Sequence, residues 1–120
     1  SCLHNKPFKV YRGHKRIFDY VEDTCRTFAN IAEHFKPGEV YNIGSREDWV
    51  IDIEELADIV LKETGADPKL AQYHGSEGFT TRVKVVDFSK ARRDLRHDPQ
   101  IDIREGVKRY VAWMKKVYEK

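Results

Sequence analysis

The sequence predicts one α/β domain, of the small α+β-like kind, with about four helices and a few short strands. The chain has 120 residues, of which 40% are hydrophobic, and this suffices for one domain with its own core. Apolar residues recur at three- and four-residue spacing in several segments, which is the period of a helix, while shorter segments have the composition of strands. Neither a low-complexity tract nor an interior linker divides the chain, so we expect residues 1–120 to form a single domain.

The first third of the chain contains two predicted strands on either side of one predicted helix. The alternating segment Phe8–Tyr11 predicts a strand that ends before Gly13. The helix is predicted by an apolar stripe and ends at Pro37-Gly38. The stripe consists of Val21, Cys25, Phe28, Ala32 and Phe35, and we expect the cysteine to be a small buried hydrophobe. The apolar segment Glu39–Ile43 then predicts a buried strand.

Two later helices are predicted to begin in the same way. Asp52 is placed as an N-cap with Glu55 three residues later, and Asp102 and Glu105 repeat this arrangement, so both pairs are expected to form capping boxes. Gly65 supplies the left-handed end of the first of these helices. Their apolar stripes are Leu56, Ile59 and Val60 in one, and Ile103, Val107, Val111 and Met114 in the other.

Short elements are predicted between these two helices. Leu70–Tyr73 is a strand candidate, and Val83–Val86 is a second one. The polar, glycine-rich residues from His74 to Thr81 predict a loop. Asp87 is placed to cap a short helix that runs to Leu95.

Composition excludes several classes of protein. No apolar run approaches the roughly 18 residues that a membrane-spanning helix needs, and no secretory signal is visible. The net charge of +2 is too small to indicate a nucleic-acid partner. Two cysteines make no disulfide framework, so we expect a reducing, cytoplasmic location. Cys2 and His4 lack a second pair at ligand spacing, so no metal site is predicted.

One basic cluster is a candidate phosphate site. It surrounds Gly13, a residue that lets backbone approach a ligand closely, and it consists of Arg12, His14, Lys15 and Arg16. Arginine offers a planar fork that matches phosphate oxygens. A solvated basic loop is the alternative interpretation. By composition alone, Arg82, beside the glycine-rich loop, is likewise typical of an ordinary surface residue. The basic run Lys90–Arg96 predicts a solvated helix face with Ala91 and Leu95 turned inward.

The residues themselves offer no catalytic machinery. The sequence contains no G-x-S-x-G, H-E-x-x-H, P-loop or G-x-G-x-x-G pattern. His34, His74 and His97 are scattered, and we expect surface or capping positions for them.

A series of motifs nevertheless resembles one family. The segment R-I-F-D-Y-V-E-D matches R-x-F-x-Y-V-x-D through Arg16, Phe18, Tyr20, Val21 and Asp23. A G-x-V-Y-N-I-G segment from Gly38, a capped helix I-D-I-E-E-L-A-D-I-V, a D-x-S-K-A segment from Asp87 and an E-G-V helix follow in order. In this order the motifs resemble the C-terminal, substrate-binding portion of the extended short-chain dehydrogenase/reductases, the NAD-dependent sugar-nucleotide epimerases and dehydratases.

The resemblance implies roles for three residues. In the family, the arginine that matches Arg16 contacts the diphosphate of a nucleotide-sugar, and Phe18 lies beside the same pocket. A second phosphate-facing arginine is expected ten residues before Asp87, where this chain has Glu77. Arg82 matches a further arginine of many members and is the candidate replacement, so the expected substrate-binding residues are Arg16, Phe18 and Arg82.

The resemblance also implies a missing half. In the family, the Rossmann half, with its glycine-rich turn and catalytic Tyr-x-x-x-Lys pair, precedes the region that these 120 residues match. We therefore expect a C-terminal fragment that is catalytically inactive alone, binds no cofactor itself, and belongs to an enzyme that uses NAD or NADP. Its expected partners are a nucleotide-diphosphate sugar and the Rossmann half, with self-association through the apolar surface that would face that half. The alternative is a stand-alone, non-catalytic nucleotide- or protein-binding module, whose corresponding surface should be polar.

Overall fold

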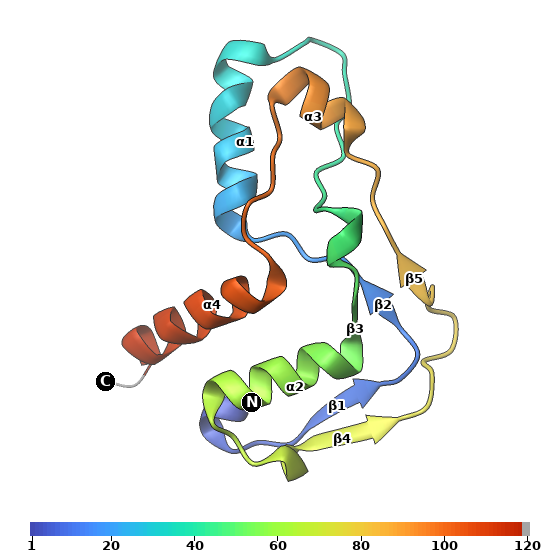
Figure 1. Cartoon of the computed structure of the whole chain (residues 1–120), viewed down its shortest axis with the longest axis vertical. Helices are drawn as coiled ribbons and strands as arrows, with labels where there is room; N and C mark the ends of the chain where they lie inside the picture. Colours follow the sequence, from blue (N-terminus) through green and yellow to red (C-terminus); the bar gives the residue numbers. More distant parts are fainter. Residues whose placement is uncertain (119–120) are drawn as a thin grey trace. The chain divides into compact units, whose positions relative to one another are not determined.

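The computed structural model describes residues 1–118, which form two compact units (Figure 1). The first unit consists of residues 1–16, 51–83 and the segment from Arg104 onward. The second consists of residues 17–50 and 84–103. The predicted fold class is confirmed, because the described residues contain four α-helices and a few short strands. Whether the 120 residues act as a single domain stays a prediction.

The first unit packs two helices with short strands. Its helices are α2 (Ile53–Thr64) and α4 (Ile103–Tyr118), and its two 3-10 turns are Cys2–His4 and Pro68–Leu70. Strand β1 (Phe8–Tyr11) pairs in parallel with β4 (Ala71–His74), and α2 lies in the connection between them (Figure 1). A second sheet has the order β3-β2-β5, with β2 at Lys15–Arg16, β3 at Ile51–Asp52 and β5 at Val83–Lys84. The parallel strands β1 and β4 need a crossover connection, and such a connection usually contains a helix, here α2.

The core of this unit lies between α2 and the parallel strand pair. Val10 of β1 and Ala71 of β4 are buried against Ala57 and Leu61 of α2. On α4, Val111 is buried, and Ile103, Val107 and Met114 are partly buried, so the predicted apolar stripe of this helix faces inward. The stripe of α2 is likewise partly buried at Leu56, Ile59 and Val60.

The start and end of α2 lie where the sequence predicts them, but the capping box at its start does not form. Asp52 is the N-cap residue, yet its side chain makes no capping hydrogen bond. Its carboxylate pairs instead with Lys15 at 3.6 Å, and the Glu55 carboxylate pairs with Arg104. Ion pairs with residues distant in the sequence thus replace the local bonds. Gly65 ends the helix with the expected left-handed backbone, at φ 67°.

The second unit contains α1 (Val21–His34), a 3-10 turn at Glu47–Trp49, and α3 (Ser89–Leu95). The N-cap residue of α3 is Phe88, whose side chain makes no capping hydrogen bond. Asp87, one position earlier, accepts a hydrogen bond from the backbone N–H of Ser89 at 2.8 Å, so the predicted residue caps the first turn from just outside the helix. Ala91 and Leu95 are fully buried, so α3 turns its apolar side inward as predicted.

The prediction for the faces of α1 is wrong. Its apolar stripe is exposed: Val21 and Phe28 are each 64% exposed, Phe35 is 55% exposed, and Cys25 is an exposed free thiol. The buried residues of the helix are Asp23 and Thr27.

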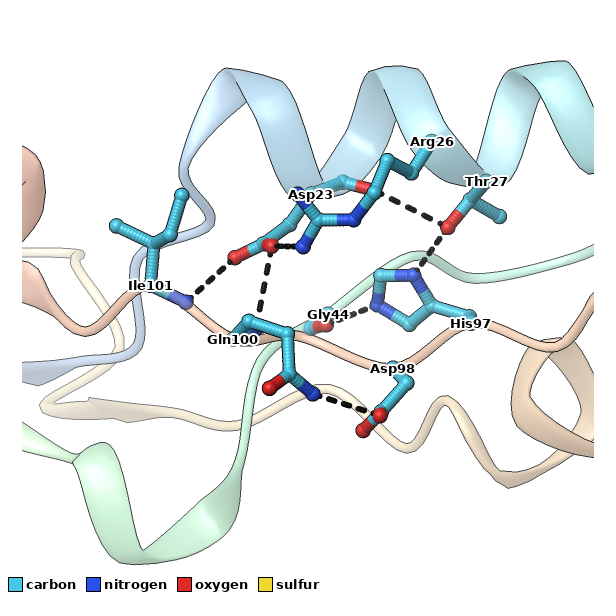
Figure 2. Close-up of polar contacts among 8 residues, drawn as sticks. All are labelled: Asp23, Arg26, Thr27, Gly44, His97, Asp98, Gln100 and Ile101. Carbon is cyan, nitrogen blue, oxygen red and sulfur yellow. Dashed lines mark hydrogen bonds and ion pairs between the residues drawn. The ribbon is translucent and has the colours of Figure 1, made fainter.

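Polar contacts with residues 97–101 explain why α1 turns its polar side inward (Figure 2). The Asp23 carboxylate accepts hydrogen bonds from the backbone N–H groups of Gln100 at 3.1 Å and Ile101 at 3.0 Å. The Thr27 hydroxyl contacts Nδ1 of His97 at 2.5 Å, and His97 Nε2 donates to the carbonyl of Gly44 at 2.6 Å. Buried backbone N–H groups need acceptors, and α1 meets that need only with its polar side inward.

His97 and the segment Glu39–Ile43 depart from the sequence prediction in the same unit. His97 is 0% exposed rather than at the surface or in a cap, because Thr27 and Gly44 satisfy both of its ring nitrogens. The segment Glu39–Ile43 is no strand, and Val40 within it is 79% exposed. A strand requires a hydrogen-bonded neighbour, and none pairs with this segment among residues 1–118.

Candidate functional site

The predicted basic cluster lies in the first unit, in the turn between β1 and β2 and in β2 itself. Gly13 adopts φ 76°, a left-handed conformation that favours glycine, although space for a Cβ is open there. Its N–H donates to the Glu54 carboxylate at 3.3 Å, which ties the turn to α2.

Ion pairing divides the cations of this region into two kinds. Arg12 pairs with Glu54 at 3.6 Å, and Lys15 pairs with Asp52 at 3.6 Å. For Arg16 and Arg82, no carboxylate lies within 4.0 Å in the part of the chain that the structure describes. The charges of Arg16 and Arg82 are therefore the ones available to an anionic ligand.

Arg16 and Arg82 are 66 residues apart in the sequence and directly joined in the structure. The Lys15 N–H donates to the Arg82 carbonyl at 2.7 Å, which pairs the two segments. The Nη1 group of Arg16 donates to the Lys15 carbonyl at 2.8 Å and to the Arg82 carbonyl at 3.1 Å. These bonds hold the guanidinium of the partly buried Arg16. Among residues 1–118, its Nε–Nη2 edge, which carries three further donors, has no hydrogen-bond acceptor.

Phe18, the third predicted site residue, lies in the second unit, where it is partly buried. Its expected place beside the pocket of Arg16 therefore stays a prediction. Glu77, which stands where the second arginine is expected, has a structural role: its carboxylate accepts a hydrogen bond from the Thr80 hydroxyl at 3.1 Å.

Sequence reasoning missed the role of His14, which it counted only as one of four basic residues. His14 is 2% exposed, and its imidazole bonds to the backbone of Glu77 and Thr81. No apolar periodicity marks His14 as buried, since it lies in a turn between two short strands. Only its partners, more than 60 residues later in the chain, reveal its position.

The second basic run lies on α3 and is engaged in ion pairs, which supports its interpretation as a solvated face. Arg93 and Lys36 both pair with the Asp94 carboxylate, at 2.8 Å and 3.0 Å, and the Tyr41 hydroxyl donates to it at 3.3 Å. The hydrogen bonds from Arg93 and Lys36 hold the pKa of Asp94 well below its ordinary value. Arg93 and Lys36 are thus already engaged by the Asp94 carboxylate.

Among residues 1–118, each unit has a hollow. The first unit has an apolar groove of about 420 Å³ that is bordered by α2, α4 and the residues before β1. The second has a mostly polar hollow of about 560 Å³ lined by Arg46, Arg92 and neighbouring residues. Neither hollow includes Arg16, Phe18 or Arg82 in its lining. Among residues 1–118, no helix is long and apolar enough to cross a membrane.

Comparison with known proteins identifies relatives of one kind. A dTDP-glucose 4,6-dehydratase of Actinoplanes sp. is 31% identical over 106 residues, which cover 87% of this chain and 32% of that protein. A UDP-glucuronate 4-epimerase of Thermodesulfobacterium geofontis is 32% identical over 119 residues, which cover 95% of this chain and 35% of that protein. No protein-family model matches the chain. The chain thus spans about one third of the length of the relatives it matches.

A solved structure has the same fold over nearly the whole chain. UDP-glucuronic acid 4-epimerase from Bacillus cereus, in complex with UDP-glucuronic acid and NAD, superimposes with a TM-score of 0.79 at 25% sequence identity. The match covers 97% of this chain and 37% of that protein. These relatives confirm the resemblance that the sequence motifs indicate.

Proposed function

We propose that this chain is the nucleotide-sugar-binding portion of a sugar-nucleotide epimerase or 4,6-dehydratase of the extended short-chain dehydrogenase/reductase family. The chain is homologous to such enzymes over about one third of their length, which supports the proposal. In this proposal the chain is the C-terminal portion, and the enzyme uses NAD or NADP. The cofactor would accept and return a hydride during the reaction. The sequence has no G-x-G-x-x-G turn. Tyr11 and Lys15 have the spacing Tyr-x-x-x-Lys, but they lie on β1 and β2 on either side of a turn, and Lys15 is paired with Asp52. No hydride step is therefore assigned to residues of this chain, and we expect it to be inactive and to bind no cofactor alone.

The observation that carries the proposal is the joined pair of unneutralised arginines. Arg16 is held by two hydrogen bonds from Nη1 and keeps its Nε–Nη2 edge for a diphosphate oxygen pair. Arg82 lies on the adjoining segment, is exposed, and adds a second positive charge. Two guanidinium groups on neighbouring segments match the two negative phosphates of a nucleotide diphosphate. Phe18 is proposed to lie beside this pocket once the whole enzyme is assembled.

The exposed apolar side of α1 supports the proposed Rossmann half as a partner. Val21, Phe28 and Phe35 form a stripe on the second unit, and such a stripe is typical of a surface that another part of a protein covers. The segment Glu39–Ile43, which is exposed at Glu39, Val40 and Asn42, adds backbone groups without a strand partner among the described residues. A stand-alone module, the alternative function, would be expected to have a polar surface here.

Titration of uridine diphosphate and thymidine diphosphate into the chain tests the proposal. We expect weak binding to the unaltered chain, because the other wall of the cleft would belong to the missing half. Arg16→Ala should weaken the binding about tenfold or more, since it removes charge-assisted hydrogen bonds worth roughly 1.5–3 kcal/mol. Arg82→Ala should weaken it less, because this side chain is exposed.

Arg12→Ala is the matched control, since Arg12 lies in the same turn but is already paired with Glu54. Its affinity for either nucleotide should stay within about twofold of the unaltered chain. Equal affinity of Arg16→Ala and the unaltered chain would remove Arg16 from the site. No binding of either nucleotide would contradict the proposed function.

A further inference from the structure

Residues 75–81 form a loop whose two ends are held by one short stretch of chain. The Arg12 N–H donates to the His74 carbonyl at 3.1 Å, just before the loop begins. The Lys15 N–H donates to the Arg82 carbonyl at 2.7 Å, just after the loop ends. Because Arg12 and Lys15 are only three residues apart, the loop leaves and returns to nearly the same place. Loops with close ends of this kind are frequently functional.

The side chain of His14 lies inside this loop. Its Nε2 atom accepts a hydrogen bond from the Glu77 N–H at 3.1 Å and lies 3.4 Å from the Ser76 hydroxyl. Its Nδ1 atom lies 3.5 Å from the Thr81 carbonyl. A backbone N–H can only donate and a carbonyl can only accept, so Nε2 is the acceptor and Nδ1 the donor in this arrangement. One side chain thus contacts both halves of the loop.

The loop has little else to hold its shape. Residues 75–79 of the loop are all exposed, and the Phe79 side chain is fully so. Gly75 and Gly78 increase the conformational entropy that the backbone loses when the loop becomes ordered. Phe79 adopts a left-handed backbone at φ 60°, which is strained for a residue with a side chain. With so little apolar contact, hydrogen bonds maintain the loop: those of the buried His14 and the bond from Thr80 to Glu77 within the loop.

We propose that His14 is a positioning residue for nucleotide binding, which holds residues 75–81 in the conformation that keeps Arg82 beside Arg16. This inference rests on the proposed function. A loop ordered before the ligand arrives loses less conformational entropy on binding, and affinity rises accordingly. His14 acts through Glu77 and Thr81 and does not itself touch the ligand.

Two substitutions separate this role from simple filling of space. His14→Gln keeps an oxygen that can accept from Glu77 and an N–H that can donate to Thr81, whereas His14→Leu keeps the approximate volume and neither bond. His4→Gln is the matched control, because it makes the same change at an exposed histidine of the same unit.

Amide hydrogen exchange by NMR on the full chain without ligand measures the hold on the loop. We expect the Glu77 amide to exchange about tenfold faster or more in His14→Leu, and at nearly the original rate in His14→Gln and His4→Gln. The amides of β1 and β4 should keep their protection in all variants, which shows that the unit remains folded. An unchanged Glu77 exchange rate in His14→Leu would refute the hold of His14 on the loop.

Titration with uridine diphosphate measures the consequence for binding. We expect affinity to fall about fivefold or more in His14→Leu and to be restored in His14→Gln. If His14→Leu released the Glu77 amide and still bound the nucleotide as tightly as the unaltered chain, the positioning role would be wrong. If the unaltered chain bound no nucleotide, the proposed function would fail, and the exchange rates would still decide whether His14 holds the loop.

Discussion

Because α1 buries its polar side, removing a polar side chain of this helix should destabilise the chain more than removing an apolar one, the opposite of an ordinary amphipathic helix. Asp23→Ala removes the acceptor of two backbone N–H groups, at Gln100 and Ile101. The bond to Ile101 is buried, and a buried donor without a partner costs about 1–3 kcal/mol. The bond to Gln100 is only partly buried, so water replaces much of it. We therefore expect the free energy of unfolding to fall by about 2–3 kcal/mol.

Phe28→Ala, five residues further along the same helix, is the contrasting substitution. The Phe28 side chain is 64% exposed, so its removal should change the free energy of unfolding by no more than about 0.5 kcal/mol. A phenylalanine in a packed core would instead cost about 3–5 kcal/mol.

Urea unfolding followed by circular dichroism measures both variants. The midpoint should move strongly for Asp23→Ala and little for Phe28→Ala, and an unchanged slope would show that both remain comparably folded. The reverse order, with a large loss for Phe28→Ala and almost none for Asp23→Ala, would mean that α1 buries its apolar stripe and that our account of its anchoring is wrong.

Two further predictions concern charge and surface. The ion pairs with Arg93 and Lys36 lower the pKa of Asp94 in the folded chain. These pairs therefore contribute fully to the free energy of unfolding at a pH above about 3.9, the ordinary pKa of the carboxyl group. Their contribution is lost as the pH falls from there through the lower pKa of the folded chain. Asp94→Asn should therefore lower the urea midpoint equally from pH 8 to pH 5, and the difference should shrink below pH 4; a difference that grew on acidification would contradict the sign. The exposed stripe of α1 should promote self-association, so light scattering at increasing concentration should show a smaller mean mass for Phe28→Ser than for the unaltered chain. If the unaltered chain were monomeric and scattered light identically to Phe28→Ser, the stripe would not be an association surface.

Local signals were sufficient to predict where most elements lie. Gly65 ends α2 because the chain leaves the helix through a left-handed backbone conformation, which glycine adopts easily. The helix begins directly after Asp52, as predicted, although the Asp52 side chain makes no capping hydrogen bond. The glycine-rich composition of residues 74–81 likewise predicted a loop, and β1 occupies the predicted residues Phe8–Tyr11. These features depend on the backbone preferences of a few adjacent residues, and such preferences are present in the sequence itself.

The candidate site was only partly predictable for the same reason. Arg16 and Arg82 could be named from the sequence motifs, but Arg12 and Lys15 have the same charge and lie in the same turn. Their carboxylate partners, Glu54 and Asp52, come from a distant segment, and no local pattern indicates which cation they neutralise.

The sequence by itself determined the helices and loops, the homology, and the identity of the candidate arginines. Only the tertiary structure decided which side of α1 is buried, which cations stay unpaired, and that His14 lies inside a loop more than 60 residues away. An apolar stripe records a preference for burial, but the buried backbone N–H groups of residues 100–101 require an acceptor, and Asp23 supplies it. Contacts between distant segments satisfy such requirements, and they exist only once the chain has folded.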